Sequence, residues 1–187
     1  MRALGHDPAD VRHVLVTHLD LDHAGGLGDF PNATVHVHVT ELAAARSITR
    51  ETRLRYRPAQ WAHGPRWAEH DAVAGEAWFG FPRVRLLEDV GVEVAMIPLH
   101  GHSAGHAGFA IADGDRWLLH AGDAYLHHGE VAAPPVMSVG LRAYHRLNSV
   151  DEAQRPANVE RLAELARGHA DVTVRCAHDP AELPRTG

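Results

Sequence analysis

The 187-residue sequence predicts an α/β fold on three observations. Short apolar runs rich in β-branched residues, typical of buried strands, alternate with stretches of helical apolar spacing. Four of these predicted strands are followed directly by histidine and aspartate residues. A hydrophobic content of 45% and this length are ordinary for one globular domain. We therefore expect a single domain over residues 1–187.

The first third of the chain predicts two strands and one helix. The expected elements are a strand at Val11–Thr17, a helical turn at Leu27–Phe30, a strand at Thr34–Val39 and a helix at about Glu41–Arg53 with Thr40 as N-cap. Valines alternate with His36 and His38, which predicts a half-buried strand with these histidines on its exposed face.

The remainder predicts an antiparallel meander followed by a helix and a last strand. Residues 56–82 have no clear periodicity but hold six of the eleven aromatic residues, which indicates either a lid over a substrate or a satellite core. No element is assigned to residues 125–149. The expected elements are strands at 84–88, 92–99, 108–112 and 117–121 with a hairpin turn at 113–115, a helix at 151–167, and a strand at 171–176. Pro156 is expected either to lie in the first turn of this helix or to kink it.

Composition narrows the class of partner. The net charge of -6 disfavours general binding to nucleic acid or to an anionic membrane, so we expect a small-molecule substrate. Cys176 is the single cysteine, which excludes an intramolecular disulfide. No apolar window has the length of a signal peptide or a transmembrane helix, and this predicts a cytoplasmic protein.

The segment from His18 to His23 places two imidazoles and two carboxylates within six positions, directly after a predicted strand. Alternate residues that leave a strand point to the same side, so His18 and Asp20 can converge on one point. Asp22 and His23 are expected to diverge from each other and to serve a second point. Imidazole and carboxylate ligands suit zinc, manganese or iron. The loop therefore predicts a site for one or two metals.

Three further fragments each follow a predicted strand: His100 to His106 with two histidines around Ser103, His120 to Asp123, and Cys176 to Asp179 around His178. Together with the first loop, they resemble in order the motifs of the metallo-β-lactamase superfamily. The resemblance is closest to the branch of N-acyl homoserine lactonases and glyoxalase II. It departs from the HxHxDH signature at Asp20, where that signature has its second histidine.

The resemblance implies an αββα sandwich and a set of seven metal ligands. His18, Asp20 and His102 would hold the first metal, Asp22, His23 and His178 the second, and Asp123 would bridge both. His106 would orient a ligand without touching a metal. Several strands precede the HxHxDH loop in this superfamily, so the resemblance also implies an N-terminally truncated sandwich. Either the start of the chain is assigned too late, or the chain is a shortened variant. A shortened sheet exposes strand edges and favours homo-oligomerisation or instability.

The implied activity is hydrolysis of an ester, lactone or thioester by a metal-bound hydroxide, with two divalent ions, zinc first and manganese or iron as alternatives. Asp22 and Asp123 are the expected catalytic carboxylates, and Tyr125 is a candidate donor to a substrate oxygen. Asp20 adds a third carboxylate, which lowers the charge of the centre from 4 − 2 = +2 to 4 − 3 = +1. This change favours harder metals and suggests a second hypothesis, that the protein is an iron oxidoreductase similar to the flavodiiron branch. A third hypothesis is that the chain is an inactive, truncated remnant that only binds its ligand.

Overall fold

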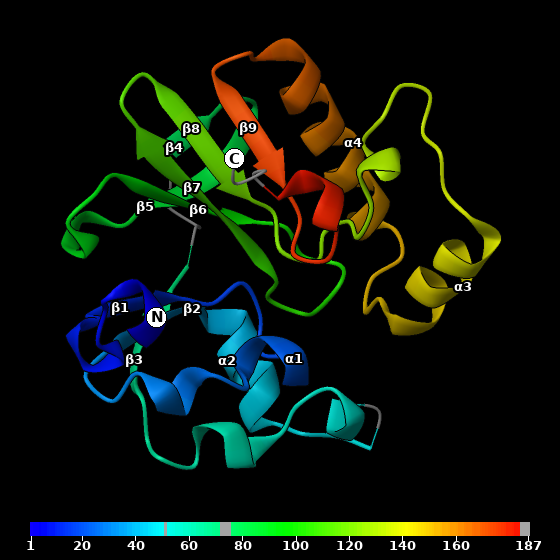
Figure 1. The fold of residues 1–187 in the computed structure, drawn as a ribbon. Coiled ribbons are helices and arrows are strands. Elements are labelled where there is room, and N and C mark those ends of the chain that lie inside the picture. Colours follow the sequence, from blue (N-terminus) through cyan, green and yellow to red (C-terminus); the bar gives the residue numbers. More distant parts are fainter. Residues whose placement is uncertain (51, 72–75, 184–187) are drawn as a thin grey trace. The chain divides into compact units, whose positions relative to one another are not determined.

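The computed structural model describes residues 1–50, 52–71 and 76–183, and the chain divides into two compact units (Figure 1). Met1–Asp71 forms the N-terminal unit and Ala72–Gly187 forms the C-terminal unit. The prediction of a single domain stays a prediction. Among the described residues, no helix is both long and apolar enough to cross a bilayer.

The N-terminal unit is built on a three-stranded parallel sheet with the order β1-β2-β3. Its elements are β1 (His13–Leu15), α1 (Leu21–Ala24), β2 (Thr34–His38), α2 (Val39–Arg46) and β3 (Arg66–His70). Parallel strands need crossover connections, and the segments that contain α1 and α2 supply them. Both helices pack on one apolar cluster, which includes Val37, Leu42 and Tyr56.

Several expectations for this unit were wrong in detail. The second strand is central in its sheet rather than half-exposed, and its histidines are only 4% and 6% exposed. His36 hydrogen-bonds to His13 and His70 from the two neighbouring strands, at 3.0 and 2.9 Å. His38, not Thr40, is the N-cap of α2, because its Nδ1 accepts the Thr40 N–H.

The expected helix to Arg53 ends earlier, at Arg46, where Ser47 leaves helical geometry. Residue 51, which this expectation also included, lies outside the described residues. The aromatic stretch contains β3 and β4 (Glu76–Trp78), and its residues 72–75 again lie outside the described part. Its aromatic side chains pack in or against the two main hydrophobic cores rather than in a satellite core of their own.

The C-terminal unit holds a six-stranded sheet in the order β4-β5-β6-β7-β8-β9. The remaining strands are β5 (Phe81–Leu86), β6 (Val94–Pro98), β7 (Ala107–Asp113), β8 (Arg116–His120) and β9 (Val172–Arg175). Neighbouring strands are antiparallel up to β8, and β9 pairs with β8 in parallel. The predicted meander and last strand are confirmed. The segment left unassigned contains α3 (Val139–Asn148), and α4 spans Gln154–Gly168 with Pro156 in its first turn.

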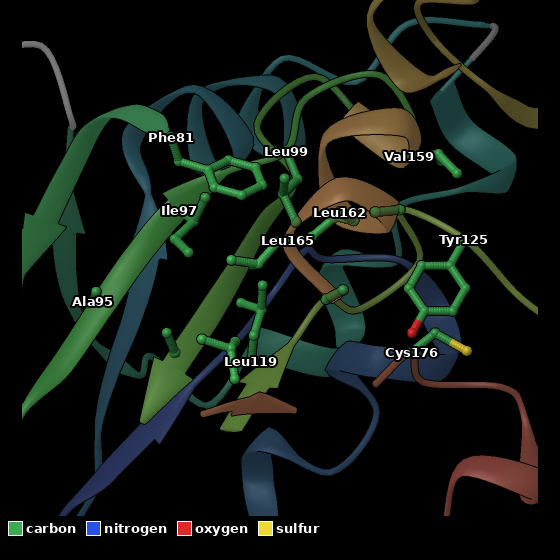
Figure 2. Close-up of a cluster of buried hydrophobic side chains, with 14 residues drawn as sticks. Phe81, Ala95, Ile97, Leu99, Leu119, Tyr125, Val159, Leu162, Leu165 and Cys176 are labelled. Atoms are coloured by element: carbon green, nitrogen blue, oxygen red, sulfur yellow. The ribbon is translucent and has the colours of Figure 1, made fainter. Parts of the chain in front are cut away.

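One face of this sheet is covered by α4, and the contact forms the main core (Figure 2). Val159, Leu162 and Leu165 recur on one side of the helix, so they all face the strands. They pack with sheet residues that include Leu99 and Leu119, both at most 1% exposed. Burial of each such leucine contributes about 1.5–3 kcal/mol. The strand ends that carry the candidate ligands are thus anchored by a packed core.

Gly101 allows the loop after β6 to lie against the start of α4. Its φ of 132° is unfavourable for any residue with a side chain. Its carbonyl accepts the N–H groups of Val150 and Asp151, at 2.8 and 3.0 Å. A Cβ at this position would lie 2.5 Å from the backbone nitrogen of Arg155. The residue before His102 must therefore be glycine.

We expect Gly101→Ala to destabilise the protein by at least about 3 kcal/mol, because backbone strain and a clash with fixed backbone atoms add together. Gly114→Ala is the matched control, since Gly114 also has a positive φ, of 61°, but has open space around it. The control should lose only about 1–2 kcal/mol. Urea unfolding of both variants measures the difference, and equal losses would contradict the packing argument.

Candidate metal centre

Four candidate ligands lie in the N-terminal unit, directly after β1. The Nε2 atom of His18 lies 3.5 Å from Oδ2 of Asp20, so the predicted convergence of these side chains is supported. Asp22 and His23 lie in α1 rather than in an extended loop, and their Oδ2 and Nε2 atoms are 3.7 Å apart. The expectation that they diverge was therefore wrong, because it assumed strand-like alternation. The rings of His18 and His23 also lie close, with centroids 4.1 Å apart.

A buried carboxylate holds the backbone of the loop that carries these ligands. Glu41, in α2, is fully buried, and its Oε1 accepts the N–H of Leu19 at 3.0 Å. Leu19 stands between two candidate ligands, so the bond sets the path of the loop at the site. Tyr56 donates its hydroxyl to the same oxygen at 3.2 Å. Burial and the adjacent Glu41 charge raise the pKa of Tyr56, which keeps this hydroxyl protonated as a donor.

Asp20 is held by a residue that sequence reasoning missed. The Nη1 atom of Arg55 lies 2.8 Å from Oδ1 and 2.6 Å from Oδ2 of Asp20. Both side chains are mostly shielded from solvent, with exposed fractions of 12% and 16%. The pair is therefore screened less than an ordinary surface ion pair.

Three candidate ligands lie in the C-terminal unit, each just past a strand or its turn. Oδ2 of Asp123 lies 3.6 Å from Nε2 of His102 and 3.3 Å from Nε2 of His178. One oxygen of Asp123 thus stands near two imidazoles from two different loops. This arrangement is what a bridging carboxylate requires.

His106 connects two of these loops. Its Nε2 accepts the backbone N–H of Asp123 at 2.9 Å, and its Nδ1 donates to the Leu99 carbonyl at 3.1 Å. These bonds fix the tautomer with the proton on Nδ1. His106 therefore orients the Asp123 loop through its backbone, in keeping with the role predicted for it.

Tyr125 has a structural role within the C-terminal unit. It is fully buried beside Cys176 (Figure 2), and its hydroxyl donates to both carboxylate oxygens of Glu182 at 2.9 and 3.1 Å. The same carboxylate accepts the Cys176 N–H at 2.6 Å. Glu182 thus joins the segment after Asp123 to the segment before His178. Burial and the Glu182 charge raise the pKa of Tyr125.

A second buried carboxylate, Glu130, supports the same region. It accepts the Leu126 N–H at 2.8 Å and pairs with His145 and Arg155 at 3.0 and 3.4 Å. Burial acts to raise the pKa of Glu130, but the bonds from His145 and Leu126 and the charge of Arg155 lower it overall. Its charge therefore stabilises the fold at neutral pH, and this contribution is lost as the pH falls through the lowered pKa.

The separations between candidate ligands are those of metal ligands rather than of hydrogen bonds. Atoms bound about 2.0–2.2 Å from a tetrahedral metal lie about 3.3–3.6 Å apart. The four ligand pairs described above lie at 3.3–3.7 Å. A contrasting case is His128 and Asp179, whose 2.6 Å contact is a hydrogen bond. The donor set in each unit therefore fits a divalent ion.

The family model for the metallo-β-lactamase superfamily matches residues 1–162 of the chain. The chain belongs to this superfamily. Its sequence is 43% identical to a probable metallo-hydrolase of Mycobacterium tuberculosis over 181 residues, which are 95% of this chain and 57% of that protein. It is 31% identical to the N-acyl homoserine lactonase AttM of Agrobacterium fabrum, over 96% of this chain and 62% of the lactonase. The chain thus spans about three-fifths of the length of these relatives.

Solved structures support the metallo-β-lactamase fold that the motifs implied. A variant of AiiA from Bacillus thuringiensis with N-decanoyl-L-homoserine bound at its active site matches with a TM-score of 0.69 and 20% identity. The match covers 97% of this chain and 61% of AiiA. AidC, a dizinc quorum-quenching lactonase in complex with a product, matches with a TM-score of 0.64 and 15% identity, over 96% of this chain and 61% of AidC.

Sequence motifs predicted the candidate ligands but not the residues that support their loops. Arg55 and Glu41 lie 35 and 22 positions from their partners in the loop, so no local spacing links them. One signal was available for Glu41: it precedes Leu42 and stands four positions before Ala45, both buried, which places a charge on the apolar side of α2. Arg55 carried no comparable signal.

We expect Glu41→Ala to lower the free energy of unfolding by about 2–4 kcal/mol, because the Leu19 N–H and the Tyr56 hydroxyl both lose their acceptor. Tyr56→Phe removes one donor and leaves the Leu19 bond intact, so it should cost only about 1 kcal/mol. Urea unfolding measures both losses. Hydrogen exchange of the Leu19 amide should accelerate in Glu41→Ala alone, and unchanged exchange there would contradict this role.

Cys176 should resist alkylation in the native protein. It is 8% exposed, and burial raises the pKa of its thiol to about 12, against a lowering effect of the His178 N–H. At pH 8 about one thiol in ten thousand is then ionised. Iodoacetamide labelling followed by mass spectrometry should be slow in buffer and fast in concentrated urea. Rapid labelling of the folded protein at pH 8 would show that the thiol is accessible and ionised.

Proposed function

We propose that this chain is a metal-dependent hydrolase whose seven candidate ligands hold two divalent ions. Superfamily membership supports the proposal, and one observation carries it: within each unit the candidate ligands are already spaced as metal ligands. The proposed ligands of the first metal are His18, Asp20 and His102, those of the second metal are Asp22, His23 and His178, and Asp123 bridges both.

Zinc is the proposed ion. Four of the seven ligands are histidines, and a spacing near that of a tetrahedral edge suits zinc. AidC, which shares the fold, is a dizinc enzyme. When bound, such ions supply a nucleophile from water at neutral pH and polarise a carbonyl oxygen.

The chain's own residues then have separate tasks. Asp123 offers Oδ2 to both sides of the centre, and His106 keeps its backbone in place. Asp22 lies beside His23, and its side chain is 54% exposed. We assign to Asp22 the transfer of a proton from the attacking water to the leaving oxygen. Tyr125 takes no part, because Glu182 holds its hydroxyl inside the core.

The proposed substrate is a small carbonyl ester, with a lactone first and a thioester as the alternative. The relatives named as N-acyl homoserine lactonases support a lactone, and structures with N-acyl homoserine products bound support a carbonyl ester of this size. The net charge of -6 is consistent with a partner that is not a nucleic acid.

Removal of metal should abolish hydrolysis. We expect chelation of the full chain to lower turnover of N-acyl homoserine lactones at least about a hundredfold, with recovery on addition of Zn²⁺. His18→Ala and Asp123→Ala should reduce both metal content and turnover, because each removes a proposed ligand. Metal content is measured by elemental analysis and turnover by lactone ring opening.

His6→Ala is the matched control, since His6 is an exposed histidine that belongs to none of the ligand motifs. It should retain the metal content and turnover of the unmodified chain. Metal-dependent turnover that survives both ligand substitutions would overturn the site assignment. If the chain hydrolyses thioesters but not lactones, the proposed lactone substrate is overturned, whereas the proposed metal centre stands.

A further inference from the structure

Asp20 departs from the superfamily signature, and the structure shows what accompanies the departure. A histidine ligand is neutral and offers one atom to a metal. An aspartate is charged and can offer two. A direct replacement therefore changes both the charge and the number of ligand atoms at this position.

Arg55 prevents Asp20 from binding a metal through both of its carboxylate oxygens. A single nitrogen, Nη1, lies within 2.8 Å of both carboxylate oxygens. This places it between the two oxygens, on the side from which a metal would bind both of them. Oδ2 nevertheless remains 3.5 Å from Nε2 of His18, a separation typical of two ligands on one metal. Asp20 can then ligate through one oxygen only.

Arg55 also restores the charge. With three carboxylates and two divalent ions, the centre carries 4 − 3 = +1, whereas inclusion of the guanidinium gives 4 − 3 + 1 = +2. This equals the 4 − 2 = +2 of the signature with two carboxylates. The expectation that Asp20 lowers the charge of the centre and favours harder metals counted the ligands alone and left out Arg55.

The fold holds Arg55 in place for this task. Its N–H donates to the Thr52 carbonyl at 2.9 Å, and the N–H of the next residue, Tyr56, donates to the same carbonyl at 3.0 Å. Tyr56 is 2% exposed and is bonded to Glu41, which also holds the ligand loop. The carboxylate of Glu41 thus binds the neighbour of each residue of this pair: Leu19 beside Asp20, and Tyr56 beside Arg55.

We propose that Asp20 and Arg55 together replace one neutral histidine, and that Arg55 is the positioning residue that limits Asp20 to one ligand atom. The inference rests on the proposed metal centre. Arg55 thereby keeps the coordination number low and favours zinc over manganese, which prefers more oxygen ligands.

The test compares the metal spectra of four proteins: the unmodified chain, Arg55→Gln, the double variant Asp20→His with Arg55→Gln, and Arg53→Gln. Gln is shorter and neutral, so Arg55→Gln frees the second oxygen of Asp20 without adding a charge. Arg53→Gln is the matched control, because Arg53 is an exposed arginine two positions away. Circular dichroism of the metal-free proteins establishes that each one folds.

Each full-length protein is loaded with Co²⁺, and its visible absorption is recorded. We expect Arg55→Gln to weaken the Co²⁺ bands, because a higher coordination number lowers their intensity. Competition between Mn²⁺ and Zn²⁺ should shift toward Mn²⁺ by about tenfold, the usual lower range for loss of a residue that supports a ligand. The double variant should recover the intensity and selectivity of the unmodified chain, as should Arg53→Gln.

Unchanged bands and selectivity in Arg55→Gln would overturn the inference and would leave Arg55 as an ordinary ion-pair partner. Failure of the double variant to recover them, with its fold intact, would overturn it as well. If the unmodified chain binds neither Co²⁺ nor Zn²⁺, the proposed metal centre itself is overturned. That outcome is distinct from a centre that binds metal without regard to Arg55.

Discussion

Most of the candidate ligands lie in loops, apart from Asp22 and His23 in the short helix α1, and buried acceptors hold backbone N–H groups of these segments. Four such bonds recur at 2.6–3.0 Å: Leu19 to Glu41, Asp123 to His106, Leu126 to Glu130, and Cys176 to Glu182. A loop outside a sheet must satisfy its amides elsewhere. Here the acceptors come from packed elements or from neighbouring ligand loops, so the ligand positions are set by the protein itself.

Buried carboxylates suit this task only when their own charge is compensated, because desolvation of an unpaired carboxylate is costly. Glu130 shows how the unit meets this cost. His145 and Arg155 both lie within 3.4 Å of it, and the backbone of Arg155 in turn lies against Gly101, the residue before a ligand. The ion pair and the close glycine packing therefore depend on each other. A substitution that breaks the ion pair or the glycine packing therefore disturbs the ligand loops, although it replaces no candidate ligand.

Sequence patterns predicted the features of this protein that depend on interactions between residues close together in the sequence. The meander from β5 to β8 followed from short apolar runs and a turn at 113–115, and the candidate ligand motifs were found by their place after predicted strands. The burial of His36 was not predictable in this way, because it depends on strands that come from both sides of β2. The same holds for β3, whose mixed sequence gave no alternation and whose place in the sheet follows from its pairing with β2. Contacts over long sequence separations, not weak propensities, account for these errors.

The proposed ligand Asp20 illustrates the same limit in chemical terms. Motif comparison transfers ligand identity position by position, but the electrostatic character of a metal centre belongs to all charges around it. A carboxylate counted alone indicates a weaker Lewis acid and a harder metal. Counted with a guanidinium 2.6 Å away, it adds no net charge. Since the compensating residue lies 35 positions along the chain, a changed ligand is interpretable only once the fold has placed its partner. In the proposed metal centre, the charge of Asp20 is thus balanced by Arg55, so the change in the motif does not by itself require iron chemistry.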